Sequence, residues 1–216
     1  LQNLDVLFAI DRAGLVGLDG ATHQGAFDLS YLRCIPNMVI MAPSDEDLAW
    51  KMLNTGYEFS GPATVRYPRG SGRGITNQKS EEIIEIGKSK TILQSEETEV
   101  VILSFGSLLN SAVEAGNAIK AKVVDMRFVK PIDEDLIKEI NNKFRLIVTL
   151  EDNVIAGGAG SAVNEILLEM NSTSKVLNLG LPDRFIEHGD QEQQKIMNNL
   201  DGTGVRKSIE KKLKSI

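Results

Sequence analysis

The sequence predicts an α/β fold of two successive, mainly parallel sheets with helices on both faces. Short apolar runs that are typical of strands alternate with helical stretches along the whole chain, a pattern typical of parallel sheets covered by helices. A polar, glycine-rich stretch at residues 71–80 interrupts the alternation. We therefore predict one unit over residues 1–85, including this linker, and a second unit over residues 86–216.

The first unit is expected to contain three strands and two helices. Pro36 should end the first helix, because proline cannot continue an α-helix. Ser44 is expected to cap the second helix, whose first turn carries acidic residues where the helix dipole favours negative charge. The strands are predicted at 6–10 (VLFAI, expected to be buried), 37–41 and 63–67, and the helices at 26–33 and 44–59.

The second unit repeats the alternation, and its apolar runs are again short enough to be strands. Asp133 is a plausible helix cap, because it follows a proline and precedes a helical stretch. Strands are predicted at 87–93, 99–104, 122–126, 145–150 and 175–179, and helices at 108–119, 131–141, 162–170, 191–199 and 204–214.

Length and composition indicate a globular protein without a general nucleic-acid-binding surface. The 216 residues suffice for one large or two small domains. The net charge of −6 argues against a broadly basic surface, although local basic pockets are compatible with it. No apolar run approaches the roughly 20 residues that a membrane span needs. The single cysteine, Cys34, leaves no internal disulfide, and we expect it to be buried in a reducing compartment.

Two arginines follow predicted strands directly. Arg12 comes after the strand at 6–10 and Arg69 after the strand at 63–67, and open α/β sheets bind ligands at the carboxyl ends of their strands. Because guanidinium groups match phosphate or carboxylate oxygens, the two could clamp a phosphorylated small molecule. The alternative is that each arginine pairs with a surface carboxylate. Arg66, which lies inside a strand, is interpreted as structural.

Asp19 and His23 lie in the glycine-rich stretch after Arg12, where the chain is expected to form an exposed loop. A histidine near a carboxylate can bind a substrate hydroxyl and transfer protons near neutral pH. The alternative is a solvated loop histidine without a role. His188 has no comparable neighbours in the sequence and is interpreted as structural.

The stretch GGAGS at residues 157–161 precedes a predicted helix. Such a turn could hold a phosphate at the helix N-terminus, but it matches neither GxGxxG nor a Walker sequence. A tight strand-to-helix turn is therefore the preferred interpretation. We find no cluster of metal ligands, and no metal site is predicted.

Several of these segments resemble the 1-deoxy-D-xylulose-5-phosphate synthase family of transketolase-like enzymes. The similarity covers essentially the whole chain. Transketolases share only the core Asp19-Gly20 and Thr22-His23-Gln24, whereas GAFDLSYLRCIPNM after it favours the synthases. The matching segments are 11–46 (beginning DRAGLVGLDGATHQ), GPATVRYPRG (61–70), VVDMRFVKPID (123–133), VTLEDNVIAGGAGSAVNE (148–165) and LNLGLPDRFIEHG (177–189).

The resemblance implies a specific chemistry. The family condenses pyruvate with D-glyceraldehyde 3-phosphate, with loss of carbon dioxide, in isoprenoid and thiamine biosynthesis. It uses thiamine diphosphate and Mg²⁺, and the protein orients the cofactor. By position, Arg12 and Arg69 match the arginines that hold the aldehyde's phosphate, and Asp19 and His23 match polar positions of the substrate pocket. His23 is expected to hydrogen-bond an acceptor oxygen and to assist proton transfer.

The resemblance also implies that the chain is incomplete. In the family, thiamine diphosphate and Mg²⁺ bind mainly through an N-terminal domain, so we assign no residue of this chain to the cofactor or the metal. Residues 1–85 then correspond to the latter part of a pyrimidine-binding domain, and residues 86–216 to a transketolase C-terminal-like domain. The chain alone is expected to be inactive. The alternatives are a subunit of a split transketolase, or a non-catalytic module that binds sugar phosphates or acts in assembly.

Partners and location follow from the same resemblance. We expect pyruvate and D-glyceraldehyde 3-phosphate as substrates, the N-terminal half of the enzyme as a partner, and a homodimer. The sequence shows no pattern of a signal peptide or a transit peptide, and neither is expected. The bacterial cytoplasm is the predicted location, with a mature plastid enzyme as the alternative.

Overall fold

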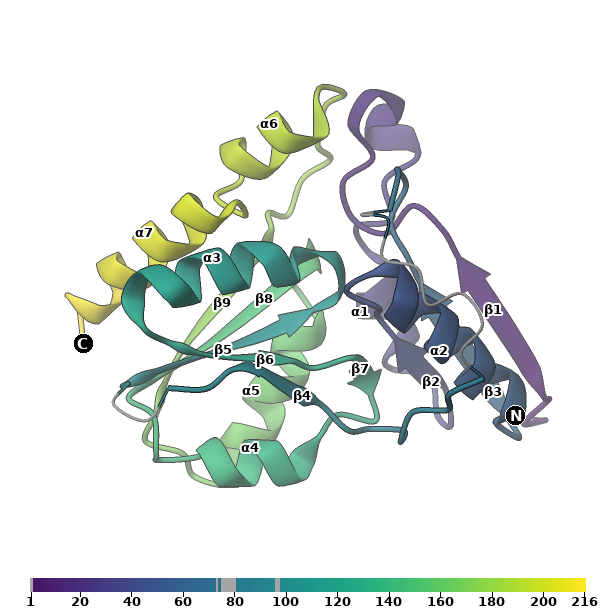
Figure 1. Cartoon of the computed structure of the whole chain (residues 1–216), viewed down its shortest axis with the longest axis horizontal. Coiled ribbons are helices and arrows are strands. Elements are labelled where there is room, and N and C mark those ends of the chain that lie inside the picture. The colour runs from purple at the N-terminus through teal and green to yellow at the C-terminus, as the bar shows by residue number, and fades with distance from the viewer. Residues whose placement is uncertain (1, 73, 75–80, 96–97) are drawn as a thin grey trace.

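Two sheets with helices packed on them form the computed structural model, which describes residues 2–72, 74, 81–95 and 98–216 (Figure 1). One sheet has four strands in the order β1-β3-β2-β7, and the other has five in the order β4-β6-β5-β8-β9. The strands pair in parallel except at β7 and β4, each of which is antiparallel to its neighbour. The predicted α/β class with mainly parallel sheets is therefore confirmed.

The four-stranded sheet combines segments from both halves of the chain. Its strands are β1 (Val6–Ile10), β2 (Val39–Met41), β3 (Pro62–Arg66) and β7 (Phe128–Lys130). The helical elements before and after β2 are the 3-10 helix η1 (Gly17–Thr22), α1 (Asp28–Leu32) and α2 (Glu46–Glu58). The sequence did not predict β7, which forms by pairing with β2 from the other half of the chain. The boundary near residue 85 stays a prediction, and the linker residues 73 and 75–80 lie outside the described residues.

The five-stranded sheet carries helices on both faces (Figure 1). Helices α3 and α7 cover one face, and α4 and α5 cover the other. Strands are β4 (Lys90–Leu93), β5 (Val100–Phe105), β6 (Lys122–Asp125), β8 (Leu146–Val154) and β9 (Lys175–Leu181). Helices are η2 (Gly106–Leu108), α3 (Leu109–Ile119), α4 (Glu134–Ile140), α5 (Ala159–Glu169), α6 (Gln191–Met197) and α7 (Gly202–Leu213). Within the described residues, no helix is both long and apolar enough to cross a membrane.

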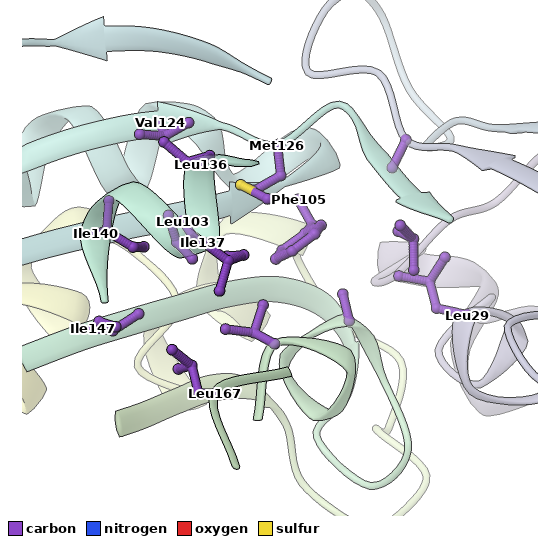
Figure 2. Packing of buried hydrophobic residues seen from close by; sticks show 14 of the residues in the cluster. Leu29, Leu103, Phe105, Val124, Met126, Leu136, Ile137, Ile140, Ile147 and Leu167 are labelled. Atoms are coloured by element: carbon purple, nitrogen blue, oxygen red, sulfur yellow. The ribbon is translucent and has the colours of Figure 1, made fainter. Parts of the chain in front are cut away.

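One hydrophobic core joins the two halves of the chain. Figure 2 shows part of it, in which Leu29 from α1 belongs to the same cluster as Phe105 from β5 and Met126, which directly follows β6. Ile40 of β2 is also fully buried in this cluster. Because side chains of both sheets share one hydrophobic cluster, the two sheets pack against a common core.

Two burial predictions are wrong, for local reasons. Strand β1 was expected to be buried, but Val6 and Phe8 are 38% and 47% exposed. They lie on an edge strand, on the face away from α2, which packs against Leu7. Cys34 is exposed because it lies in the turn after α1, where its Sγ donates to the Tyr31 carbonyl at 3.0 Å.

Strand β8 and helix α5 are longer than predicted. The expected strand ended at Leu150, but β8 continues through Val154 and is buried along its whole length. This continuation was not predicted, because residues 151–153 are polar and polar residues after an apolar run usually mark the end of a strand. Helix α5 begins at Ala159 rather than at 162.

Asp45, rather than the predicted Ser44, caps α2. The Asp45 Oδ1 atom accepts from the Leu48 N–H at 2.8 Å. The Ser44 hydroxyl instead donates to Asp125 Oδ2 at 2.7 Å, and the Arg127 N–H donates to Asp125 Oδ1 at 3.1 Å. This buried contact ties the start of α2 to the carboxyl end of β6, so it fixes the two sheets to each other.

The Asp125→Asn variant should change how stability depends on pH. Burial raises the pKa of Asp125 to about 6, although the bonds from Ser44 and Arg127 oppose this. Because this value lies above that of the unfolded chain, the carboxyl stabilises the fold at acidic pH, and that contribution is lost as pH rises from about 4 through 6. In urea unfolding, the free energy of unfolding of the variant minus that of the native chain should therefore increase by on the order of 2 kcal/mol between about pH 4 and about pH 7.5. Exposed Asp183→Asn is the control; a pH-independent difference for Asp125→Asn would contradict the assignment.

Candidate functional site

The candidate site begins where β1 and β3 end side by side. The two strands pair in parallel with Ile10 opposite Arg66, so the segments after them start at the same sheet edge. Arg12 has a positive φ of 61°, which turns the chain sharply after β1. The Gly25 N–H donates to the Arg12 carbonyl at 2.8 Å. A Cβ on Gly25 would lie 2.5 Å from that oxygen, so only glycine allows this close approach.

Both predicted arginines meet one carboxylate. Arg69 Nε lies 2.7 Å from Asp19 Oδ2, and Arg12 Nε lies 3.8 Å from the same oxygen. The Asp19 side chain is 25% exposed, whereas those of Arg12 and Arg69 are 39% and 50% exposed. Arg12 also pairs with exposed Asp11 at 2.5 Å. The arrangement therefore gathers two guanidinium groups around one half-buried carboxylate, with part of each guanidinium open to a ligand.

Asp19 lies in η1, which the sequence analysis expected to be a loop. Gly20 breaks this short helix with φ 67° and ψ −161°, and His23 follows directly after its last residue. The His23 side chain is exposed, and its Nδ1 lies 2.8 Å from the Thr22 hydroxyl rather than bonding to Asp19. The structure thus brings Arg12, Arg69 and Asp19 together and leaves the His23 side chain hydrogen-bonded only to its own loop.

A buried ion cluster around Arg66 lies next to the site, because Arg66 donates to the carbonyl of Gly25, which itself bonds to Arg12. Arg66 is 1% exposed, and its guanidinium donates to Asp28 Oδ2 at 2.7 Å, to Asp152 Oδ1 and to the Gly25 carbonyl at 2.6 Å. Ser107 donates to Asp152 Oδ2 at 2.5 Å. Burial disfavours the charged form, but Asp152 and Asp28 outweigh it, so the pKa of Arg66 lies above its ordinary value. Arg66 is therefore structural, as predicted.

The glycine-rich turn at 157–161 holds a carboxylate of the protein itself. Glu151, which is fully buried in β8, accepts from the Ala159 and Gly160 N–H groups at 2.8 Å each. A Cβ on Gly158 would lie 2.2 Å from Glu151 Oε2. Burial raises the pKa of Glu151 to about 8, against the opposing effect of these two N–H groups. Because Glu151 occupies the helix N-terminus, the turn is closed to a phosphate, in agreement with the preferred interpretation.

A cavity of about 610 Å³ opens beside Arg69, between the start of α2 and helices α3 and α6. Carboxylates outnumber cations along its wall, so it is not itself a good phosphate site. The charged residues that line it are Asp45, Glu46, Glu114, Glu192, Asp201, Arg69 and Lys195.

No described residues form a plausible metal site. Across residues 2–72, 74, 81–95 and 98–216, no group of three or more His, Cys, Asp or Glu side chains could hold a metal ion.

Sequence reasoning missed Gln194 and Asp152. Gln194 is 5% exposed and bonds to Gly17, which lies 177 residues away in the sequence. A local sequence pattern cannot predict a contact between residues so far apart in the chain. For Asp152 a signal was present, because an uncompensated acidic residue beside an apolar strand needs a buried cationic partner.

In comparison with known proteins, each half of the chain matches a family model. Residues 89–205 match the family model of the transketolase C-terminal domain, and residues 1–74 match that of the transketolase pyrimidine binding domain. The whole chain is 56% identical to the 1-deoxy-D-xylulose-5-phosphate synthase of Aeromonas hydrophila and covers 34% of that protein. Over 99% of its length it is 55% identical to the synthase of a Marinomonas species, again covering 34% of the relative. The chain thus spans about a third of the length of the curated relatives it matches.

The fold has a counterpart among solved structures. A protein described as a split gene transketolase, in the form of an inactive beta4 tetramer, superimposes with a TM-score of 0.82 at 28% identity. The match covers 95% of this chain and 66% of that one.

Proposed function

The chain belongs to the transketolase family, and from this we propose that it supplies the acceptor-binding part and the C-terminal domain of a 1-deoxy-D-xylulose-5-phosphate synthase. The proposed reaction is the condensation of pyruvate with D-glyceraldehyde 3-phosphate, with loss of carbon dioxide, at the start of isoprenoid biosynthesis. The identity of 53–56% to synthases supports this choice within the family.

The observation that carries the proposal is the meeting of Arg12 and Arg69 at Asp19. A phosphate monoester has oxygens that two guanidinium groups can bind at once. Asp19 holds the Arg69 Nε edge and lies near that of Arg12, whose Nη1 pairs with exposed Asp11. The exposed part of each guanidinium beyond these contacts is assigned to the phosphate. We assign Arg12 and Arg69 to the aldehyde's phosphate and Asp19 to their orientation within the substrate pocket.

His23 is assigned to the other end of the aldehyde. Its exposed imidazole follows the loop that carries Asp19, so it can approach a bound acceptor without moving a packed element. We assign it to hydrogen-bond the aldehyde oxygen and to deliver a proton to that oxygen as the carbon–carbon bond forms.

Thiamine diphosphate and Mg²⁺ belong to the proposal as cofactors of the complete enzyme, held by polypeptide outside this chain. The described residues lack a metal-binding group, and the glycine-rich turn is filled by Glu151. The exposed edge of β1 suits such a polypeptide, because Leu4, Val6 and Phe8 line an apolar hollow of about 270 Å³ there. A homodimer and a bacterial cytoplasmic location remain parts of the proposal.

The proposal can be tested with a chimaera. The C-terminal third of the Aeromonas hydrophila synthase is replaced by this chain, and the product is assayed from pyruvate and D-glyceraldehyde 3-phosphate with both cofactors. We expect the chimaera to form 1-deoxy-D-xylulose 5-phosphate and the 216-residue chain alone to form none. Turnover by the isolated chain would overturn the assignment of the cofactors to other polypeptide. A folded chimaera without turnover would refute the proposed function.

A second candidate function is that of a subunit in a split transketolase, which the solved split gene transketolase favours. The donor substrate distinguishes the synthase function from the transketolase function. A synthase uses pyruvate, whereas a transketolase uses a ketose phosphate, so the chimaera is assayed with each donor. A non-catalytic sugar-phosphate or assembly module would use neither.

A further inference from the structure

The loop that carries Asp19 is held mainly by the C-terminal part of the chain. We call residues 186–194, which comprise the segment before α6 and the first turn of α6, the C-terminal clamp. The Gly189 N–H donates to the Gly17 carbonyl at 3.2 Å, and the Ile186 N–H donates to Gln24 Oε1 at 3.2 Å. Gln191 Nε2 donates to the Leu15 carbonyl at 2.5 Å. Contacts therefore reach the loop before, within and after η1.

Gln194 makes the most enclosed of these contacts. Its side chain is 5% exposed, its Oε1 accepts from the Gly17 N–H at 3.1 Å, and its Nε2 donates to the Gly17 and Glu187 carbonyls at 3.3 and 2.7 Å. Gly17 has a φ of 65°, so this peptide has a conformation that needs support from outside the loop. A buried amide with all these bonds made fixes its partner closely.

We propose that Gln194 is a positioning residue for the phosphate-binding site, an inference that rests on the function proposed above. Its amide fixes Gly17, Gly17 precedes Asp19 by two residues, and Asp19 orients Arg69 and Arg12. The C-terminal domain thereby sets the geometry in which the two guanidinium groups meet a phosphate.

The Gln194→Met variant tests this in the chimaera, because methionine keeps the volume of glutamine and removes its hydrogen bonds. Gln193→Met is the matched control, since Gln193 is exposed on the same helix. We expect the KM for D-glyceraldehyde 3-phosphate to rise about 10-fold for Gln194→Met, with kcat within about twofold. The KM for unphosphorylated D-glyceraldehyde should change less than about twofold. Equal losses for both aldehydes, or no loss for either, would overturn the proposal.

Two further measurements keep the test decisive. If circular dichroism shows that Gln194→Met does not fold, Gln194→Asn takes its place, because the shorter amide draws back from Gly17, and the absence of a phosphate-selective effect there overturns the proposal. If the unsubstituted chimaera does not use the aldehyde, the proposed function fails separately. Hydrogen exchange in the 216-residue chain then decides the positioning role. The amides of Gly17 and Asp19 should exchange at least about 10-fold faster in Gln194→Met than in Gln193→Met, and equal rates would overturn it.

Discussion

Replacing Arg12 and Arg69 together by alanine should lower kcat/KM for D-glyceraldehyde 3-phosphate in the chimaera by on the order of 10²- to 10³-fold. Each guanidinium loses charge-assisted bonds to the phosphate, and such bonds contribute about 1.5–3 kcal/mol each. The two losses should not add fully, because both arginines lie against Asp19. Removing both also leaves the Asp19 carboxylate facing the phosphate, which adds repulsion.

The phosphate-free aldehyde shows whether the arginines act on the phosphate. With D-glyceraldehyde the double variant should lose less than about threefold, and the KM for pyruvate should stay within about twofold. Arg206→Ala on α7 is the control, because Arg206 is about as exposed as Arg12 and lies outside the site. Equal losses with both aldehydes would show that the arginines hold the loop and do not bind the phosphate.

The sequence predicted the site to the extent that strand ends carry ligand-binding residues. Arg12 and Arg69 were selected because each follows a predicted strand, and in the structure both lie just beyond a strand end. That they bind a ligand stays a prediction. The sequence could not show that β3 lies next to β1, with β2 on its far side. It also could not show that Asp19 turns toward both arginines, since that depends on the break of η1 at Gly20.

Contacts between distant segments account for most of what the sequence did not reveal. Gln194 and Gly17 meet only because α6 packs beside η1, and β7 pairs with β2 only because both units share one core. Glu151 was placed after a strand end, although it lies inside β8, because the Ala159 and Gly160 N–H groups at the N-terminus of α5 hydrogen-bond its buried carboxyl group. In each case a long-range partner overrides the local pattern.

The largest loss of stability is expected for Arg66→Met. This substitution leaves Asp28 and Asp152, whose side chains are 4% and 5% exposed, without their cationic partner. Breaking a buried ion pair on one side costs about 3–5 kcal/mol, because a desolvated charge remains unpaired. For a chain of this size that corresponds to a fall in Tm of about 10 °C. The Gly25 carbonyl also loses its bond to the guanidinium, so the end of the substrate loop should loosen.

A second substitution tests whether the unpaired charge is the cause. Adding Asp28→Asn to Arg66→Met removes one of the stranded carboxylates, so the double variant should regain part of the lost stability. Arg145→Met is the control, because Arg145 and Glu99 form an exposed pair whose loss should hardly change the Tm. Thermal unfolding followed by circular dichroism measures all three variants. If Asp28→Asn lowered the Tm further, or if Arg66→Met cost no more than Arg145→Met, the buried charges would not be what holds the two sheets together at this point.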